Sequence, residues 1–194
     1  MYFKYKEKKY AIERYPSSKN KSLRAWSAAD EYLLKYLNEN NISYTKPLIY
    51  NDRFGFLSTI LSKQQPNIII NYKSQEKSLE INLKKHGIDL NIISKKRPLD
   101  KLKTSIDLAL IKIPKSLDLF RFQLDQLHES IKENSVVVCA FMTKYFSAQI
   151  LKIAEEYFEQ CEQSVAWKKA RLLFLKKKRK VEKKELINSI SYST

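Results

Sequence analysis

The sequence predicts an α/β fold in which a doubly wound, mostly parallel sheet is covered by helices on both faces. Short runs of consecutive apolar residues, such as residues 67–71 and 106–113, are typical of strands buried on both faces. Segments with apolar residues at helical spacing alternate with these runs, and the connections between them are short. With 194 residues, 43% of them hydrophobic, the chain is long enough for one well-buried domain.

The individual elements follow from apolar periodicity and from the proline and glycine residues that interrupt it. Ser22 is the predicted N-cap of a first helix over residues 23–37, whose apolar stripe includes Trp26 and Leu33. Strands are then predicted at 48–50, 67–71, 90–93, 106–113 and 136–141. Helices are predicted between or after them at 56–61, 78–85, 118–132 and 148–160. A final hairpin is expected to pair residues 164–167 with 171–175.

The loop after the strand at 48–50 has an unusual composition for a sheet of this kind. Nucleotide-binding sheets usually carry several glycines there, because backbone N–H groups must approach the ligand closely. Here Asn51, Asp52 and Gly55 are the candidate cofactor loop, and the chain has only one other glycine, Gly87. The sequence therefore predicts a degenerate cofactor site, in which Asp52 is better explained as a turn or helix-capping residue than as a ligand.

The net charge of +16 is concentrated at the two ends of the chain. Residues 1–24 contain 8 basic and 2 acidic side chains, residues 163–194 contain 10 and 2, and the middle contains 19 and 17. These counts give +6, +8 and +2, and such segregation favours an anionic polymer as partner. Three parts are predicted: a basic N-terminal arm (1–22), the sheet domain (23–175) and a basic tail or linker (176–194).

The predicted phosphate-binding residues lie on the hairpin and in the block that follows it. They are Lys168, Lys169, Arg171, Lys176, Lys177, Lys178, Arg179 and Lys180. A solvated linker is the alternative for this basic block. Tyrosine and phenylalanine residues interleaved with lysines near the N-terminus are a further RNA-stacking candidate, whereas Trp26 and Trp167 are expected to anchor elements to the core.

Other partners and compartments are less favoured by the composition. No run of about 18 apolar residues exists to span a bilayer, and the charged N-terminus has no apolar signal core, so a cytoplasmic protein without membrane contact is expected. The chain has two cysteines and two histidines, and their spacing is not that of metal ligands, so no metal site is expected.

Four ordered segments together resemble the N-terminal half of the bacterial large-subunit ribosomal RNA guanine-N2 methyltransferase G family, which is related to the small-subunit methyltransferase C family. They are residues 23–34 (LRAWSAADEYLL), 51–55 (NDRFG), 110–115 (LIKIPK) and 166–172 (AWKKARL). The resemblance implies a class I methyltransferase (Rossmann-like) fold ending in an antiparallel hairpin. It also implies a second domain, absent from this chain, that binds S-adenosylmethionine and carries an Asn-Pro-Pro-Phe catalytic loop.

This chain departs from a working methyltransferase at two further places. Tyr72 and Lys73 follow the second strand where an acidic ribose acceptor is expected, and Glu76 lies three residues too far along. Lys112-Ile-Pro-Lys-Ser116 stands in place of the catalytic loop, without its amide and aromatic side chains. We therefore expect no catalytic residue and no cofactor in this chain.

The resulting prediction is a non-catalytic domain that binds or positions ribosomal RNA, 23S rRNA in particular, for a separate catalytic domain. Two alternatives stay open. One is a self-contained S-adenosylmethionine-dependent methyltransferase with an atypical loop, and the other is a purely structural scaffold domain.

Overall fold

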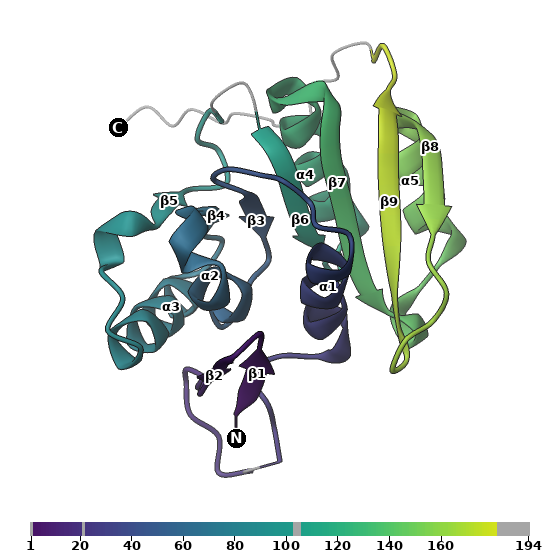
Figure 1. The fold of residues 1–194 in the computed structure, drawn as a ribbon. Coiled ribbons are helices and arrows are strands. Elements are labelled where there is room, and N and C mark those ends of the chain that lie inside the picture. Colours follow the sequence, from purple (N-terminus) through teal and green to yellow (C-terminus); the bar gives the residue numbers. More distant parts are fainter. Residues whose placement is uncertain (1, 21, 103–105, 182–194) are drawn as a thin grey trace, which may run out of the picture.

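The computed structural model describes residues 2–20, 22–102 and 106–181. Its middle layer is a seven-stranded sheet made of β3 (Leu48–Tyr50), β4 (Asn67–Ile69), β5 (Ser94–Lys96), β6 (Ile106–Lys112), β7 (Ile131–Met142), β8 (Phe158–Gln163) and β9 (Ala170–Lys178). The strand order is β5-β4-β3-β6-β7-β9-β8 (Figure 1). The first five strands in this order are parallel, and β9 is antiparallel to both of its neighbours. The predicted doubly wound α/β sheet with a terminal antiparallel hairpin is confirmed.

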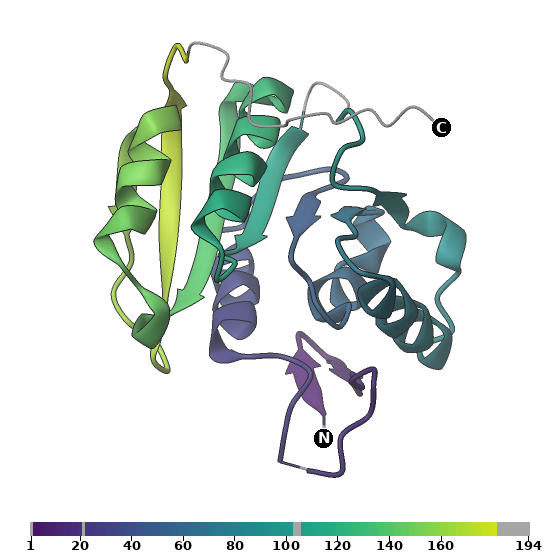
Figure 2. The ribbon, with the colours of Figure 1, turned by 180° about the vertical axis from the view of Figure 1, so that it is seen from behind.

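Helices cover both faces of the sheet (Figures 1 and 2). They are α1 (Ala28–Glu39), α2 (Phe56–Ile60), α3 (Lys73–Lys85), α4 (Leu117–Ser130) and α5 (Ala148–Tyr157), with 3-10 turns at Ser62–Gln64, Leu90–Ile92 and Thr143–Tyr145. Successive residues of a strand point to opposite faces, so Leu110 of β6 packs with α1 and α2 while Ile111 packs with α4 and α5. Leu79 and Leu83 of α3 pack on Ile68 of β4, on the same face as α1.

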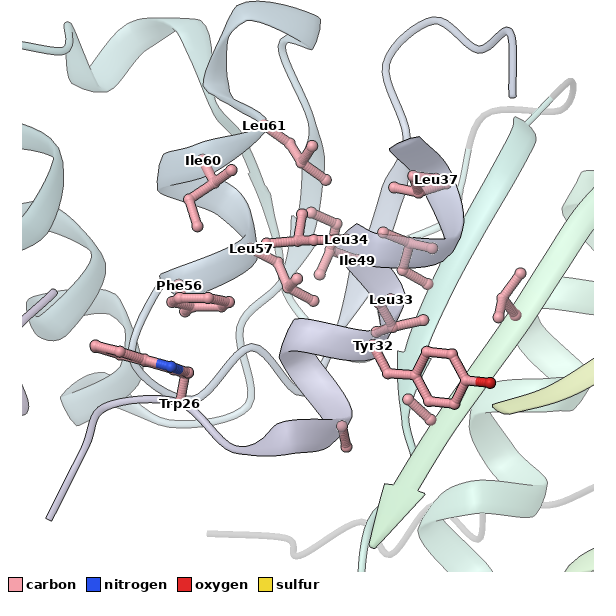
Figure 3. Close-up of a cluster of buried hydrophobic side chains, with 14 of the residues drawn as sticks. Trp26, Tyr32, Leu33, Leu34, Leu37, Ile49, Phe56, Leu57, Ile60 and Leu61 are labelled. Carbon is pink, nitrogen blue, oxygen red and sulfur yellow. The ribbon is translucent and has the colours of Figure 1, made fainter. Parts of the chain in front are cut away.

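The packing between α1 and α2 is the aromatic and aliphatic cluster drawn in Figure 3. The rings of Trp26 and Phe56 stack there with their centroids 5.2 Å apart. Leu33 and Leu34 of α1 are fully buried beside them. Each such leucine contributes about 1.5–3 kcal/mol by leaving water, so this cluster fixes the loop between β3 and α2 relative to the sheet.

The N-terminal segment, expected to be a basic arm, forms a small antiparallel hairpin made of β1 (Phe3–Tyr5) and β2 (Lys8–Tyr10). The Phe3 ring meets Phe56 edge-on with centroids 5.0 Å apart. The backbone N–H of Glu13 donates to the Asn82 side-chain oxygen over 2.8 Å. The hairpin is therefore docked on the domain. Figures 1 and 2 place it at the end of the molecule where β6 and β7 end.

The first helix begins later than predicted. Ser27, and not Ser22, precedes α1, because the Asp30 carboxylate accepts hydrogen bonds of 2.7 Å from both the backbone N–H and the hydroxyl of Ser27. Trp26, which contributed to the apparent helical stripe, lies in the preceding loop and is buried by packing on Phe56.

The strand predicted at residues 90–93 is wrong. Leu90–Ile92 is a 3-10 turn, because the Asp89 carboxylate accepts a hydrogen bond of 2.9 Å from the Asn91 backbone N–H. The edge strand is instead β5, which begins at Ser94. The helix before it starts at Lys73, five residues earlier than predicted.

The predicted hairpin ends are also displaced. Helix α5 ends at Tyr157, and residues 158–163, whose polar sequence lacks a strand-like alternation, form β8. Residues 164–167, expected to form a strand, belong to the connection between β8 and β9, where Trp167 and Ala170 form an isolated bridge. Residues 176–178 of the expected tail continue β9, and residues 182–194 of that tail lie outside the described residues.

Candidate functional site

The edge at which the parallel strands end is the first candidate site. In open α/β sheets, ligands bind outside the carboxyl ends of the strands, where the order of the strands reverses direction. Here that point lies between β3 and β6, and the predicted loop of Asn51, Asp52 and Gly55 follows β3 directly. What these side chains contact decides whether the edge is open to a ligand.

Asp52 faces the protein. Its side chain is buried, and one carboxylate oxygen accepts from the Ser58 backbone N–H over 2.8 Å and from the Ser58 hydroxyl over 2.6 Å. Burial raises the pKa of the Asp52 carboxyl, while these two hydrogen bonds favour its charged form. Asp52 therefore stabilises the first turn of α2, and its carboxylate is occupied within the fold.

Gly55 is needed for close packing as well as for its backbone conformation. Its φ of +72° lies in the left-handed region, and a Cβ built on it would lie 2.9 Å from the Cα and the Cδ1 of Leu79. Helix α3 thus packs directly on the loop that would cradle a nucleotide. The single glycine of this loop serves helix packing, since the space beside it is filled by protein.

Asn51 is the centre of a hydrogen-bonded network across the edge. Its side-chain nitrogen donates to the Lys112 carbonyl and to Gln123 Oε1, both over 2.8 Å. Its side-chain oxygen accepts from Gln123 Nε2 over 2.9 Å and from Asn71 Nδ2 over 3.0 Å. Four hydrogen bonds satisfy the amide fully, so strands β3, β4 and β6 and helix α4 are joined where a ligand would otherwise bind.

Gln123 and Gln75, both of which are buried, were not predicted as site residues from the sequence. Gln75 donates to the Ile69 carbonyl over 3.1 Å and accepts from the Asn71 backbone N–H over 3.0 Å. A signal for Gln123 does exist in the sequence, because it interrupts the apolar stripe between Phe120 and Leu127 at helical spacing. A polar side chain on a buried stripe needs partners, and the strand ends supply them.

The ends of β4 and β6 carry the other two departures from a methyltransferase. Glu76, the displaced acid, forms ion pairs with Lys73 at 2.6 Å and Lys95 at 3.1 Å. Hydrogen bonds from these two ammonium groups lower the pKa of Glu76 to about 2. Lys112 Nζ lies 2.8 Å from a carboxylate oxygen of buried Asp30, so it ties β6 to α1.

The residues at this edge do not fit S-adenosylmethionine well. The loop lacks further glycines, its one acid is directed at Ser58, and Tyr72 and Lys73 stand where an acidic ribose acceptor is needed. Among residues 2–20, 22–102 and 106–181, no cluster of three or more His, Cys, Asp or Glu side chains offers a metal site. Within the same ranges no helix is long and apolar enough to cross a membrane.

The predicted phosphate-binding residues lie at the two ends of β9. Lys168, Lys169 and Arg171 are beside the connection from β8, at the end of the molecule that carries the N-terminal hairpin (Figure 1). The second block, which begins at Lys176, is at the opposite end, about 20 Å away at ~3.3 Å per residue. The structure therefore does not bring the eight residues into one surface.

The second block is partly engaged in the fold. Lys178 Nζ donates to the Ile131 carbonyl over 3.2 Å, and Arg179 Nε donates to the Phe158 carbonyl over 3.3 Å. Lys176, Lys177 and Lys180 are exposed, although Lys176 Nζ lies 3.2 Å from a carboxylate oxygen of Glu162. A free cationic surface at this end depends on these three lysines.

The first block sits on a strained turn. Trp167 and Ala170 exchange two backbone hydrogen bonds of 2.8 Å, and the two residues between them, Lys168 and Lys169, have φ values of +48° and +63°. Two-residue turns of this shape favour Asn-Gly, because side chains with a Cβ cost about 1–2 kcal/mol each in the left-handed region. Lysines at both positions are therefore unusual, and strain of this kind is characteristic of functional sites.

A cavity of 280 Å³ opens beside this turn. It is lined by the hairpin strand β1, by helix α1 and by Trp167 and Lys168. Lys168 Nζ lies 2.9 Å from Oε2 of Glu31, a buried residue that also accepts from Trp26 Nε1 over 2.9 Å. Trp26 is a buried anchor as expected, whereas Trp167 is only half-buried because it also lines this cavity.

Solved methyltransferase structures share this fold. Solved structures with similar folds include the ribosomal protein L11 methylase from Lactobacillus delbrueckii subsp. bulgaricus, with a TM-score of 0.63 and 15% identity over 78% of this chain and 79% of that chain. Another is N-methyltransferase NodS from Bradyrhizobium japonicum WM9 in complex with S-adenosyl-L-homocysteine, with a TM-score of 0.59 and 11% identity over 76% and 85%. At these identities the likeness concerns the fold alone, which is that of the class I methyltransferases.

The sequence defines the family more narrowly. The profile of the RLMG N-terminal domain matches residues 1–179, and the chain belongs to this family. The protein named ribosomal RNA large subunit methyltransferase G from Pseudoalteromonas translucida is 34% identical over 170 residues, which cover 86% of this chain and 44% of that protein. Its namesake from Colwellia psychrerythraea is 35% identical over 185 residues, covering 87% and 45%. The chain thus spans less than half the length of these relatives.

Proposed function

We propose that this chain is a non-catalytic RNA-positioning domain, which binds ribosomal RNA for a separate S-adenosylmethionine-dependent domain that methylates a guanine of 23S rRNA. The observation that carries this proposal is the closed carboxyl edge of the sheet. There the Asn51 amide is fully hydrogen-bonded to neighbouring strands and to Gln123, and Gly55 is packed against Leu79. A domain that fills its own cofactor position is better suited to binding than to group transfer.

The loop after β6 supports the same view. Methylation of a base amino group needs oxygen acceptors for that group and a ring that packs on the base. Lys112, the last residue of β6, and Lys115 in the loop stand here instead, and ammonium groups donate hydrogen bonds but accept none. Because Lys112 is already paired with Asp30, its side chain contributes to stability.

The charge distribution favours RNA as the partner. The excess of +6 and +8 at the two ends of the chain lies on a domain whose middle is nearly neutral. Lysines and arginines on phosphates release counterions, so the affinity is expected to fall linearly with salt on logarithmic axes. The relatives named as ribosomal RNA methyltransferases make ribosomal RNA the first candidate.

The test is fluorescence anisotropy of labelled 23S rRNA hairpins with the 194-residue chain, from low to physiological salt. The binding variant replaces the three exposed lysines of the second block, Lys176, Lys177 and Lys180, with serine. It spares Lys178 and Arg179, whose side chains bond the backbone of neighbouring strands. A control with the same charge loss replaces three other exposed lysines with serine, namely Lys63, Lys84 and Lys152.

Micromolar or tighter binding that weakens more in the binding variant than in the control supports RNA positioning. Each lost contact to a single strand should reduce the salt slope by about 0.7. Equal losses in both variants would mean that only net charge matters, as expected for a scaffold domain. Calorimetric titration with S-adenosylmethionine should give no binding heat, and micromolar affinity there would instead support a self-contained methyltransferase.

A further inference from the structure

The cavity beside the Trp167 turn is lined mainly by cationic side chains. Lysines 4, 6, 35 and 168 and the single acid Glu31 line it. Lys4 and Lys35 also pair with Glu7 and Glu39, and Arg24 shares the Glu31 carboxylate. These five cations and three acids leave a net charge of +2 around the cavity, which favours an anion as ligand.

The same cavity has an aromatic wall. Phe3 and Tyr5 of β1 line it together with Trp167 of the turn, and all three rings are half-buried. Aromatic rings interleaved with lysines are the combination with which proteins hold single-stranded nucleic acids, since bases stack on rings and phosphates pair with ammonium groups. A volume of 280 Å³ is small for a ligand site and admits one planar group, but no duplex.

Glu31 fixes the ring and the cation relative to each other. Its carboxylate is buried and holds Lys168 Nζ, which in turn lies 4.4 Å from the centroid of the Trp167 ring. Arg24 Nη1, 3.1 Å from Oε1, shares the same carboxylate, so two cations outweigh this one acid. Lys168 also has a left-handed backbone conformation, with a φ of +48°, in the two-residue turn.

We propose that this cavity binds one unstacked nucleotide of single-stranded RNA, with the base against the aromatic wall and a phosphate on the surrounding lysines. The proposal rests on the RNA-positioning function proposed above and assigns it a site. It joins the N-terminal hairpin to the first lysine block, two features that are far apart in the sequence. A docked acidic peptide is the competing occupant, and the choice of RNA follows from the three aromatic residues that line the cavity together with its lysines.

The decisive variant is Trp167→Ala, because it removes a stacking surface without changing the net charge. Binding of a labelled oligouridylate to the 194-residue chain should weaken about 5-fold to 150-fold, the range for loss of one base–aromatic stack. Binding of a blunt RNA duplex should be unchanged. Circular dichroism and urea unfolding establish that the variant is folded.

A second measurement does not require removal of the aromatic ring. Trp26 is buried, so fluorescence quenching by the oligouridylate should report on Trp167 and should disappear in Trp167→Phe. Tyr145→Ala is the matched control, since Tyr145 is exposed and flanked by Lys115 and Lys144 but lies outside the cavity. It should bind the oligouridylate as the wild type does.

The outcomes separate this proposal from the one on which it rests. Unchanged single-strand affinity in Trp167→Ala, together with normal salt-dependent binding, overturns the nucleotide site and leaves RNA positioning intact. Weakening in Tyr145→Ala in place of Trp167→Ala would move the stacking site to the loop after β7 and also overturns it. A chain that binds neither oligouridylate nor rRNA hairpins refutes both proposals, and binding of poly-glutamate but not of RNA would assign the cavity to an acidic peptide.

Discussion

Replacing Gly55 with alanine should destabilise this domain far more than replacing Gly87, although both glycines have positive φ values. Gly55 has a φ of +72° and Gly87 a φ of +64°, so an alanine costs about 1–2 kcal/mol of backbone strain at either position. Only at Gly55 does the new Cβ meet neighbouring atoms, namely the Cα and Cδ1 of Leu79 at 2.9 Å. Nothing lies within 4 Å of a Cβ at Gly87.

The contact at Gly55 involves backbone, so relief by rotation of the Leu79 side chain is incomplete. Overpacking of this kind costs about 1–3 kcal/mol. Gly55→Ala should therefore lower the free energy of unfolding by about 2–5 kcal/mol, and Gly87→Ala by about 1–2 kcal/mol. At ~2–4 °C per kcal/mol for a chain of this size, the difference is measurable as a Tm shift.

Urea unfolding followed by circular dichroism is the assay, with both variants measured beside the wild type. The difference between the two variants isolates the packing of α3 on the loop, because the strain is common to both. Equal losses of stability would refute the reasoning. They would mean that α3 leaves room beside Gly55, and the cofactor position would then be open after all.

Three further outcomes are expected. Glu76→Gln should flatten the pH dependence of the free energy of unfolding in acid. The folded pKa of Glu76 is lowered from 4.5 to about 2, so its contribution is present above about pH 4.5 and is lost as pH falls towards 2. If urea unfolding gives the same slope of free energy against pH in the variant and the wild type, this reasoning is wrong. Lys112→Met should lower the free energy of unfolding by about 3 kcal/mol in the same assay, because it leaves the buried Asp30 carboxylate without its cation. The Lys112→Met, Asp30→Asn double variant should lose less stability than the sum of the two single changes. S-adenosylmethionine at high excess should leave the Tm unchanged, whereas a ligand at 100 times its Kd would add about 2.7 kcal/mol.

The layers of the fold were predictable because they depend on hydrophobic patterning. Runs such as Leu108–Ile111 in β6 are apolar on both faces, and only a sheet covered by helices on both sides buries them. Element ends depend instead on single hydrogen bonds. Ser22 and Ser27 are both possible caps in the sequence, and Asp30, three residues after Ser27, completes a capping box that Ser22 lacks.

The candidate site was only partly predictable. The low glycine content of the loop after β3 and the altered loop after β6 can be recognised in the sequence, because each depends only on which residues stand in one short segment. The partners of Asn51 are not, since Asn71 and Gln123 lie 20 and 72 residues away and meet it only through the sheet. The cavity beside Trp167 requires β1 to dock against α1, and no periodicity over three residues of β1 predicts that contact.

A closed edge has a consequence for how the domain would act on RNA. Asn51 joins the ends of β3, β4 and β6 through hydrogen bonds within the protein. The surface of the N-terminal hairpin and the Trp167 turn lies at the same end of the molecule (Figure 1), and under the proposed RNA-positioning function it would not depend on a ligand at the strand ends. An RNA segment held there would be held equally before and after each methyl transfer by a catalytic partner, which is what a positioning domain requires.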